Sequence, residues 1–326
     1  MFAMQGIGEE YISLVTDFGF TRIFGTASNK DLLINFLNSL FDGRKVIRDL
    51  KYSNSEHVGD VLYAERKAVF DVYCESEDGE KFIVEMQNAS QRFFKECSVF
   101  NSTFPIREQA PKTDNWDYRQ NAVYTVALLY YDMKDYDMMD DALDENAISH
   151  QAQLCNTATH RVLYDKLEFI FVEVTKFNKT EAELVTLYDK WLYALKNLAQ
   201  LTERPAALRD KIFDRLFQVA EIAKFTPLEL KEYEDSLKVY RDLKNSLDHA
   251  EEKGYVKGHE EGHAEGLAEG RAEGRAEGLV EGHAEGLAKG LAEGIVMTAK
   301  KLKSMGMETA VIQKATGLTA EEIEVL

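Results

Sequence analysis

The sequence predicts an α/β fold: a mixed β-sheet core flanked by helices, then a helical extension, a glycine-repeat helix of marginal stability and a small C-terminal helical module. Three observations support this prediction. Apolar segments of strand length alternate with segments of helical periodicity over the first 250 residues. A glycine then recurs at every fourth position from Gly254 to Gly294. A helical pattern returns after residue 295.

The elements of the core follow from apolar spacing and from the residues that end each run. A helix is expected over residues 31–41, where apolar side chains recur at helical spacing before Gly43. Residues 93–104 form a predicted helix that Pro105 ends. Thr226 is the expected N-cap of a helix that starts at Pro227. Further helices are predicted at 180–201 and 206–221, and strands at 45–52, 68–74, 81–87, 121–131 and 167–174.

The composition of the tail divides the chain into four predicted parts. Each interior glycine of the repeat costs a helix about 1 kcal/mol relative to alanine, so residues 251–295 are expected to form a solvated, marginally helical spacer. The alternative is a helix-association surface, because small residues permit close backbone approach. Residues 296–326 predict a helix-turn-helix-like module, in which Thr319 and Glu322 form a capping box. The α/β domain is assigned to residues 1–204 and the helical extension to 205–250.

Two of the predicted strands carry a carboxylate inside an apolar run. Asp71 lies in the first and Glu85 in the second, and the polar linker between them contains an Asp-Gly pair typical of a hairpin turn. A carboxylate in a buried strand is unfavourable unless it is paired or binds a cation. Two facing carboxylates would suit a hard divalent metal. The alternative is that both face solvent on an edge strand.

The length of the hairpin loop decides whether the two carboxylates share a face. A two-residue turn at Asp78-Gly79 would set Asp71 opposite Met86 and turn Glu85 to the other face. A three-residue loop that ends at a left-handed Gly79 would pair Asp71 with Glu85. We predict the three-residue loop, which also places Gln87 on the same face as Glu85.

Asp71, the hairpin and Glu85-x-Gln87 together resemble the core of the PD-(D/E)xK nuclease superfamily, with glutamine in the usual place of lysine. The resemblance is strongest to the Rpn-type recombination-promoting nucleases, a bacterial family often labelled transposases. It extends over nearly the whole chain, through residues 17–25, 116–126 and 167–177 and the glycine-rich tail.

The resemblance implies a set of site residues. Asp71 and Glu85 would be metal ligands, with the backbone carbonyl of Met86 as an additional ligand and Mg²⁺ or Mn²⁺ as the cofactor. Gln87 would orient water or phosphate without adding charge. Asp17 is a further candidate ligand, and its alternative role is to cap the helix before Phe18. The family often has a polar helix residue facing the site, and Gln109 lies at that place.

The charge of the chain bears on its partners. The formal net charge is −18, which disfavours tight, non-specific binding to a phosphate backbone but does not exclude catalysis. Basic residues gather locally before the hairpin and after the Glu85 strand. The first group is Arg44, Lys45, Arg48 and Lys51, and the candidates for the charge that Gln87 lacks are Lys67, Arg92 and Lys95.

Cysteine usage and hydropathy indicate the compartment. The three cysteines form no CxxC pair, which indicates a reducing environment without a disulfide framework or a zinc site. The N-terminus lacks the pattern of a signal peptide, and no apolar run reaches membrane-spanning length. We therefore expect a cytoplasmic protein without membrane contacts.

Taken with the resemblance, these residues predict a Mg²⁺-dependent endonuclease that hydrolyses phosphodiester bonds of DNA, linked to recombination or mobile elements. The alternative is a non-catalytic module of the same fold that binds DNA or protein and assembles as a homo-oligomer through its tail. A third interpretation is a scaffold whose functional part is the glycine repeat.

Overall fold

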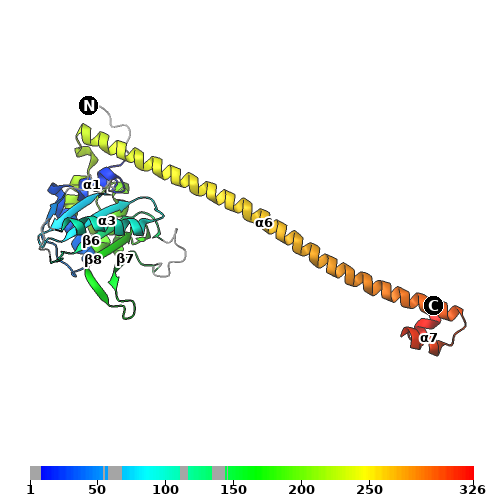
Figure 1. The fold of residues 1–326 in the computed structure, drawn as a ribbon. Helices are drawn as coiled ribbons and strands as arrows, with labels where there is room; N and C mark the ends of the chain where they lie inside the picture. The colour runs from blue at the N-terminus through cyan, green and yellow to red at the C-terminus, as the bar shows by residue number, and fades with distance from the viewer. Residues whose placement is uncertain (1–8, 54–55, 58–67, 111–116, 134–143, 145) are drawn as a thin grey trace, which may run out of the picture. The chain divides into compact units, whose positions relative to one another are not determined.

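The computed structural model describes residues 9–326 apart from 54–55, 58–67, 111–116, 134–143 and 145. Its centre is a six-stranded sheet with helices on both faces, so the predicted α/β fold is confirmed (Figure 1). The strand order is β1-β4-β5-β6-β8-β7, in which β5, β6 and β8 are parallel and the other neighbours are antiparallel. The strands are β1 (Leu50–Tyr52), β4 (Val72–Ser76), β5 (Lys81–Gln87), β6 (Val123–Leu129), β7 (Ser149–Cys155) and β8 (Val162–Glu173).

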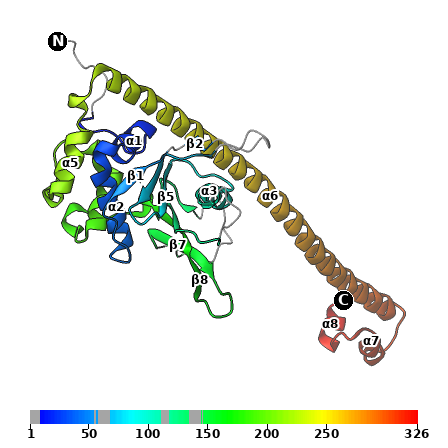
Figure 2. The ribbon, with the colours of Figure 1, turned by 60° about the vertical axis from the view of Figure 1, so that its left-hand side comes forward.

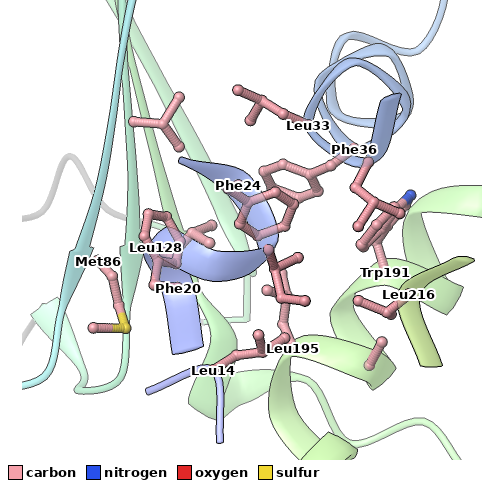
Figure 3. Packing of buried hydrophobic residues seen from close by; sticks show 14 of the residues in the cluster. Leu14, Phe20, Phe24, Leu33, Phe36, Met86, Leu128, Trp191, Leu195 and Leu216 are labelled. Atoms are coloured by element: carbon pink, nitrogen blue, oxygen red, sulfur yellow. The ribbon is translucent and has the colours of Figure 1, made fainter. Parts of the chain in front are cut away.

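The two faces of the sheet are covered differently. Side chains of β5 alternate, so Val84 and Met86 pack into the main core while Ile83 and Glu85 face the opposite side. Met86 and Leu128 point from the sheet toward Phe20 in Figure 3. Helices that supply the main core are α1 (Asp17–Phe24), α2 (Lys30–Phe41), α4 (Leu187–Asn197), α5 (Lys211–Ala220) and the start of α6 (Pro227–Ser304).

Helix α3 (Phe94–Glu108) covers the other face, on the opposite side of the sheet from α2 and α5 (Figure 2). Its first residue packs on Ala127 and Phe171 of the sheet. The prediction that Pro105 ends this helix is wrong, since Pro105 lies inside it. The side chains that α3 buries are small or polar toward its middle, at Ser98 and Ser102, so its contact with the sheet is only partly hydrophobic.

The predicted strand at residues 68–74 is divided in two. β3 (Ala68–Val69) pairs with β2 (Glu56–His57) in a separate small sheet. The chain bends at Asp71, and β4 then joins the main sheet. The predicted strand at 167–174 also begins earlier, because β7 and β8 form a hairpin that the apolar pattern did not indicate. Trp116, part of the family resemblance, lies outside the described residues.

Short 3-10 turns complete the first compact unit, Met1–Leu243. Thr226 caps α6 with a reciprocal contact between its hydroxyl and Glu229, which confirms the predicted helix start. The turns are η1 (Ala27–Asn29), η3 (Val174–Lys176), η4 (Glu181–Glu183), η5 (Leu198–Gln200), η6 (Ala206–Leu208) and η7 (Ile222–Lys224).

The second compact unit is Lys244–Leu326. α6 (Pro227–Ser304) starts in the first unit and remains helical through the whole glycine repeat. Two short helices follow, α7 (Thr309–Thr316) and α8 (Ala320–Val325), and Ala299, Ile312 and Ile323 form their small core with α6. The capping box of Thr319 and Glu322 is present as predicted. Among the described residues, no helix combines the length and the hydropathy that a membrane-spanning segment requires.

Gly79→Ala is expected to lower the free energy of unfolding by about 1–2 kcal/mol or more, because Gly79 has a φ of +79° and alanine is strained there. An added Cβ would also lie 2.4 Å from Asn121 Nδ2, so that side chain must move. Gly43→Ala is the matched control: its φ is +77°, but a Cβ there meets no atom within 4 Å. Urea unfolding of both variants should show the larger loss for Gly79→Ala, and equal losses would contradict the close contact.

Candidate functional site

The β4–β5 hairpin has the predicted three-residue loop. Val72 pairs with Val84 and Glu75 with Lys81, which sets the register that brings Asp71 opposite Glu85 at the end of the ladder. Gly79 is left-handed and donates its N–H to the Ser76 carbonyl over 2.9 Å. The sequence therefore determined the register locally, through one glycine.

Asp71 accepts a hydrogen bond at the edge of this ladder. Its Oδ2 lies 2.8 Å from the backbone N–H of Met86, so a carboxylate replaces the backbone partner that a longer β4 would have supplied. The side chain remains accessible to solvent. Surrounding protein atoms nevertheless raise the pKa of Asp71, and the charge of Asp17 raises it further, while the Met86 N–H acts against both.

Glu85 is buried in the middle of the sheet, with 5% of its surface exposed. Its pKa is raised to about 7, first by burial and then by the negative charge of Asp71. Asn101 of α3 partly offsets this shift by donating from Nδ2 to Oε1 over 3.2 Å. The negative charge of Asp71 thus disfavours ionisation of Glu85.

Asn101 of α3 contacts Glu85, and the sequence analysis did not identify it. Gln109, which was expected to face the site, makes its contacts elsewhere. Gln109 Oε1 accepts from the Asn121 N–H over 2.7 Å, and so ties the end of α3 to the chain before β6. The polar residue of α3 that reaches Glu85 is Asn101, about two helical turns before Gln109. The available signal was the polar run Ser98, Asn101 and Ser102 at helical spacing.

Gln87 lies at the end of β5 on the same side as Glu85 and is half-buried. Its Oε1 accepts from Gln91 Nε2 over 3.3 Å. Met86 buries its side chain in the main core, and its N–H is the donor to Asp71. A metal-ligating role for the Met86 carbonyl and for these side chains stays a prediction.

Asp17 is exposed in the first turn of α1. The capping role considered for it is wrong, because Thr16 caps this helix by accepting from the Gly19 N–H over 3.0 Å. The start of α1 lies beside the end of β5, where Asn88 Nδ2 donates to the Val15 carbonyl over 2.6 Å. In the described part of the chain, no three His, Cys, Asp or Glu side chains are grouped to hold a metal ion. The charge of Asp17 acts on Asp71, whose pKa it raises, and the role of Asp17 as a metal ligand stays a prediction.

Three of the four basic residues before the hairpin, Arg44, Lys45 and Arg48, form ion pairs. Arg44 contacts Glu168 at 3.1 Å, Lys45 contacts Glu80, and Arg48 lies 3.8 Å from Glu77. Glu80 and Glu77 are at the turn, the end of the hairpin opposite to Glu85. Of the other basic candidates, Lys67 lies outside the described residues, whereas Arg92 and Lys95 lie just after β5, at the start of α3.

Comparison with known protein families gives one match for this chain. The family described as "PD-(D/E)XK nuclease family transposase" matches residues 14–250, which include every site residue discussed above. Neither the curated proteins nor the solved structures gave a match. Since the family match covers most of the chain, this protein belongs to the PD-(D/E)XK nuclease family transposases.

Proposed function

We propose that this protein is a metal-dependent endonuclease that hydrolyses phosphodiester bonds in DNA. Membership of a nuclease family supports the class of reaction. The observation that carries the proposal is the charge environment of Glu85, which is buried beside a second carboxylate and has a neutral amide as its hydrogen-bond donor.

The other buried acids of the described chain show how unusual this environment is. Glu173 contacts His150 at 2.7 Å and Lys176 at 2.9 Å. Glu168 is paired with Arg44 at 3.1 Å, and Asp189 with Lys179 at 2.6 Å. Each of these three acids therefore has a basic partner, whereas the charged neighbour that shifts the pKa of Glu85 is an acid. A divalent cation would stabilise both carboxylates of the Asp71/Glu85 pair.

The donor set fits such a cation. Two carboxylates are hard oxygen ligands, which Mg²⁺ and Mn²⁺ prefer. Because the N–H and C=O of one strand residue point toward the same neighbouring strand, the Met86 carbonyl faces the side from which Asp71 approaches. When bound, the metal would activate water and stabilise the charge of the phosphate. Gln87 would orient the water or the phosphate, and Asn101 would hold Glu85 in place.

The wider role follows from the family. We propose a function in DNA recombination or in the movement of mobile elements, in the cytoplasm, where the three free cysteines would stay reduced. The strongly acidic composition and the absence of a lysine at Gln87 favour a second candidate, a non-catalytic DNA- or protein-binding module of the same fold. Plasmid nicking by the Asp71 and Glu85 variants separates the two.

The tail provides a further part of the proposal, assembly of a homo-oligomer through α6. The glycines from Gly254 to Gly294 are exposed, and a Cβ at any of them would meet no atom within 4 Å. No packing inside the described chain therefore requires glycine there, although each one destabilises the helix by about 1 kcal/mol. Leu279, Leu287 and Leu291 are about 70% exposed on the same helix. A second copy of α6 would cover these leucines and use the space that the glycines leave.

Asp71→Ala and Glu85→Ala should each reduce nicking of plasmid DNA by at least about 100-fold in Mg²⁺ or Mn²⁺, because each removes a ligand. Glu77→Ala is the matched control, since it removes an exposed carboxylate from the same hairpin. Agarose-gel quantification of nicked and linear plasmid measures the rates. Equal nicking by all four proteins would indicate a contaminant, and binding without nicking by the parent would favour the non-catalytic module.

Without metal, the free energy of unfolding should fall as pH rises from about 4.5 to about 7, by up to about 3 kcal/mol. The folded protein retains the proton on Glu85 in this range while the unfolded chain has lost it, so rising pH favours the unfolded state. Urea unfolding in EDTA from pH 5 to pH 8 measures the slope. Glu85→Gln should flatten it, and an unchanged slope in that variant would contradict the assignment.

A chain truncated after Asp248 should lose oligomer mass and keep its nicking activity, because the site lies entirely in the first compact unit. Light scattering coupled to size exclusion gives the mass. As a matched variant, alanine in place of the repeat glycines should stabilise α6 and weaken the oligomer, since the close approach is lost. If the full-length parent is itself a monomer, assembly through α6 is contradicted and the tail acts as a spacer.

A further inference from the structure

A hollow of about 460 Å³ lies on the C-terminal module, residues 296–326. Its lining comes from the end of α6, from the turn between α7 and α8, and from the end of α8. The apolar members of this lining are Val296, Leu318, Val325 and Leu326. Leu318 and Leu326 also pack against the small core of the module, whereas Val325 is 89% exposed. The hollow is therefore an apolar surface that residues 296–326 leave open.

Two acids complete the lining of the hollow, Glu321 and Glu322. Glu322 is already used within the chain, because its carboxylate accepts from the N–H of Thr319 over 2.8 Å and from its hydroxyl over 3.0 Å. Glu321 is exposed and forms no ion pair with the described residues. A partner that fits the hollow would combine an apolar side chain with a positive charge beside it.

The end of α6 presents such a combination. Met297 does not line the hollow of its own chain, and it is 70% exposed. Lys300 and Lys301 follow three and four residues later, so they lie on the same face of the helix as Met297. Both lysines are exposed, whereas Lys303 donates to two backbone carbonyls of α8 over 2.9 Å. Lys300 and Lys301 are therefore available to a partner.

The charges of the module are balanced but separated. Residues 296–326 carry four basic and four acidic side chains, although the whole chain has a net charge of −18. Two copies of a strongly acidic chain repel each other, so they associate most readily through a surface that is neutral overall. The bases gather at the end of α6 and the acids on α8: Lys300, Lys301 and Lys303, and Glu321, Glu322 and Glu324. The structure describes all six, and no ion pair joins the two groups within the chain. The module is therefore complementary to a second copy of itself.

We propose that two copies of the chain associate through this module, with Met297 of each copy in the hollow of the other. Lys300 and Lys301 of each copy then lie beside Glu321 of the other. Met297 directly follows Val296 of the hollow, so one patch contacts itself across a two-fold axis and makes both contacts at once. Methionine suits this position because its flexible side chain fills irregular gaps. This inference rests on the proposed assembly through the tail and specifies a contact that holds it.

Charge reversal tests the pairing in the full-length protein. Glu321→Lys should raise the dissociation constant for self-association at least about 10-fold, because it places three positive charges together at each of the two contacts. The double variant Lys300→Glu/Lys301→Glu should do the same with negative charges. An equimolar mixture of the two proteins should recover the mass of the parent, since every contact then joins opposite charges. Sedimentation velocity over a concentration series measures the mass and the dissociation constant.

Met297→Asp should also weaken self-association, because it places a charge in the apolar hollow. Its matched control is Met305→Asp, since Met305 is 67% exposed and does not line the hollow. Glu308→Lys and Lys314→Glu are the controls for charge reversal, because both residues are exposed outside the two charged groups. The three controls should keep the dissociation constant of the parent, and circular dichroism would verify that all variants fold.

The outcomes separate the module contact from assembly through the glycine repeat. Self-association that survives the Met297 and charge-reversal variants, but is weakened by alanine in the repeat, would overturn the module contact and leave assembly through α6 intact. Loss without recovery in the mixture would also overturn it. Loss with recovery, in a chain whose assembly tolerates alanine in the repeat, would support the module contact and refute the role of the glycines. A monomeric parent would overturn both.

Discussion

The arrangement of the site depends on one constraint, the register of the β4–β5 hairpin. A slip of one residue would turn Glu85 into the main core, where α1 and α2 pack, and would turn Val84 and Met86 out of it. Left-handed Gly79 selects the loop that avoids this, and the Asp71 carboxylate completes the ladder by accepting from Met86. A backbone conformation at the turn thus determines which face of the sheet receives the acidic pair.

The second determinant is the unequal covering of the two sheet faces. The main core is dense with aromatic and aliphatic side chains such as Phe24, Phe36 and Trp191, which hold the sheet rigidly on one side. The α3 side combines two small hydrophobic clusters with a polar strip. On that side the buried carboxylate of Glu85 receives a hydrogen bond from Asn101.

Local signals in the sequence were sufficient for the fold class, the hairpin loop and most helix starts, including the caps at Thr226 and Thr319. They failed where tertiary packing decides. Pro105 was expected to end α3, but packing on the sheet keeps the helix intact through it. The β7–β8 hairpin was missed because its strands are largely exposed and lack an apolar alternation. Asn101 could not be assigned, since its contact with Glu85 depends on how α3 lies across the sheet.

Pro105 has a consequence for α3. Proline has no N–H, and the carbonyl that its N–H would have bonded belongs to the residue four positions earlier, which is Asn101. Asn101, which donates a hydrogen bond to Glu85, therefore lies in a helical turn that lacks one backbone hydrogen bond. Bending the helix there breaks fewer hydrogen bonds than bending it elsewhere. The backbone around Asn101, whose side chain donates to Glu85, is thus held by fewer hydrogen bonds than the rest of α3.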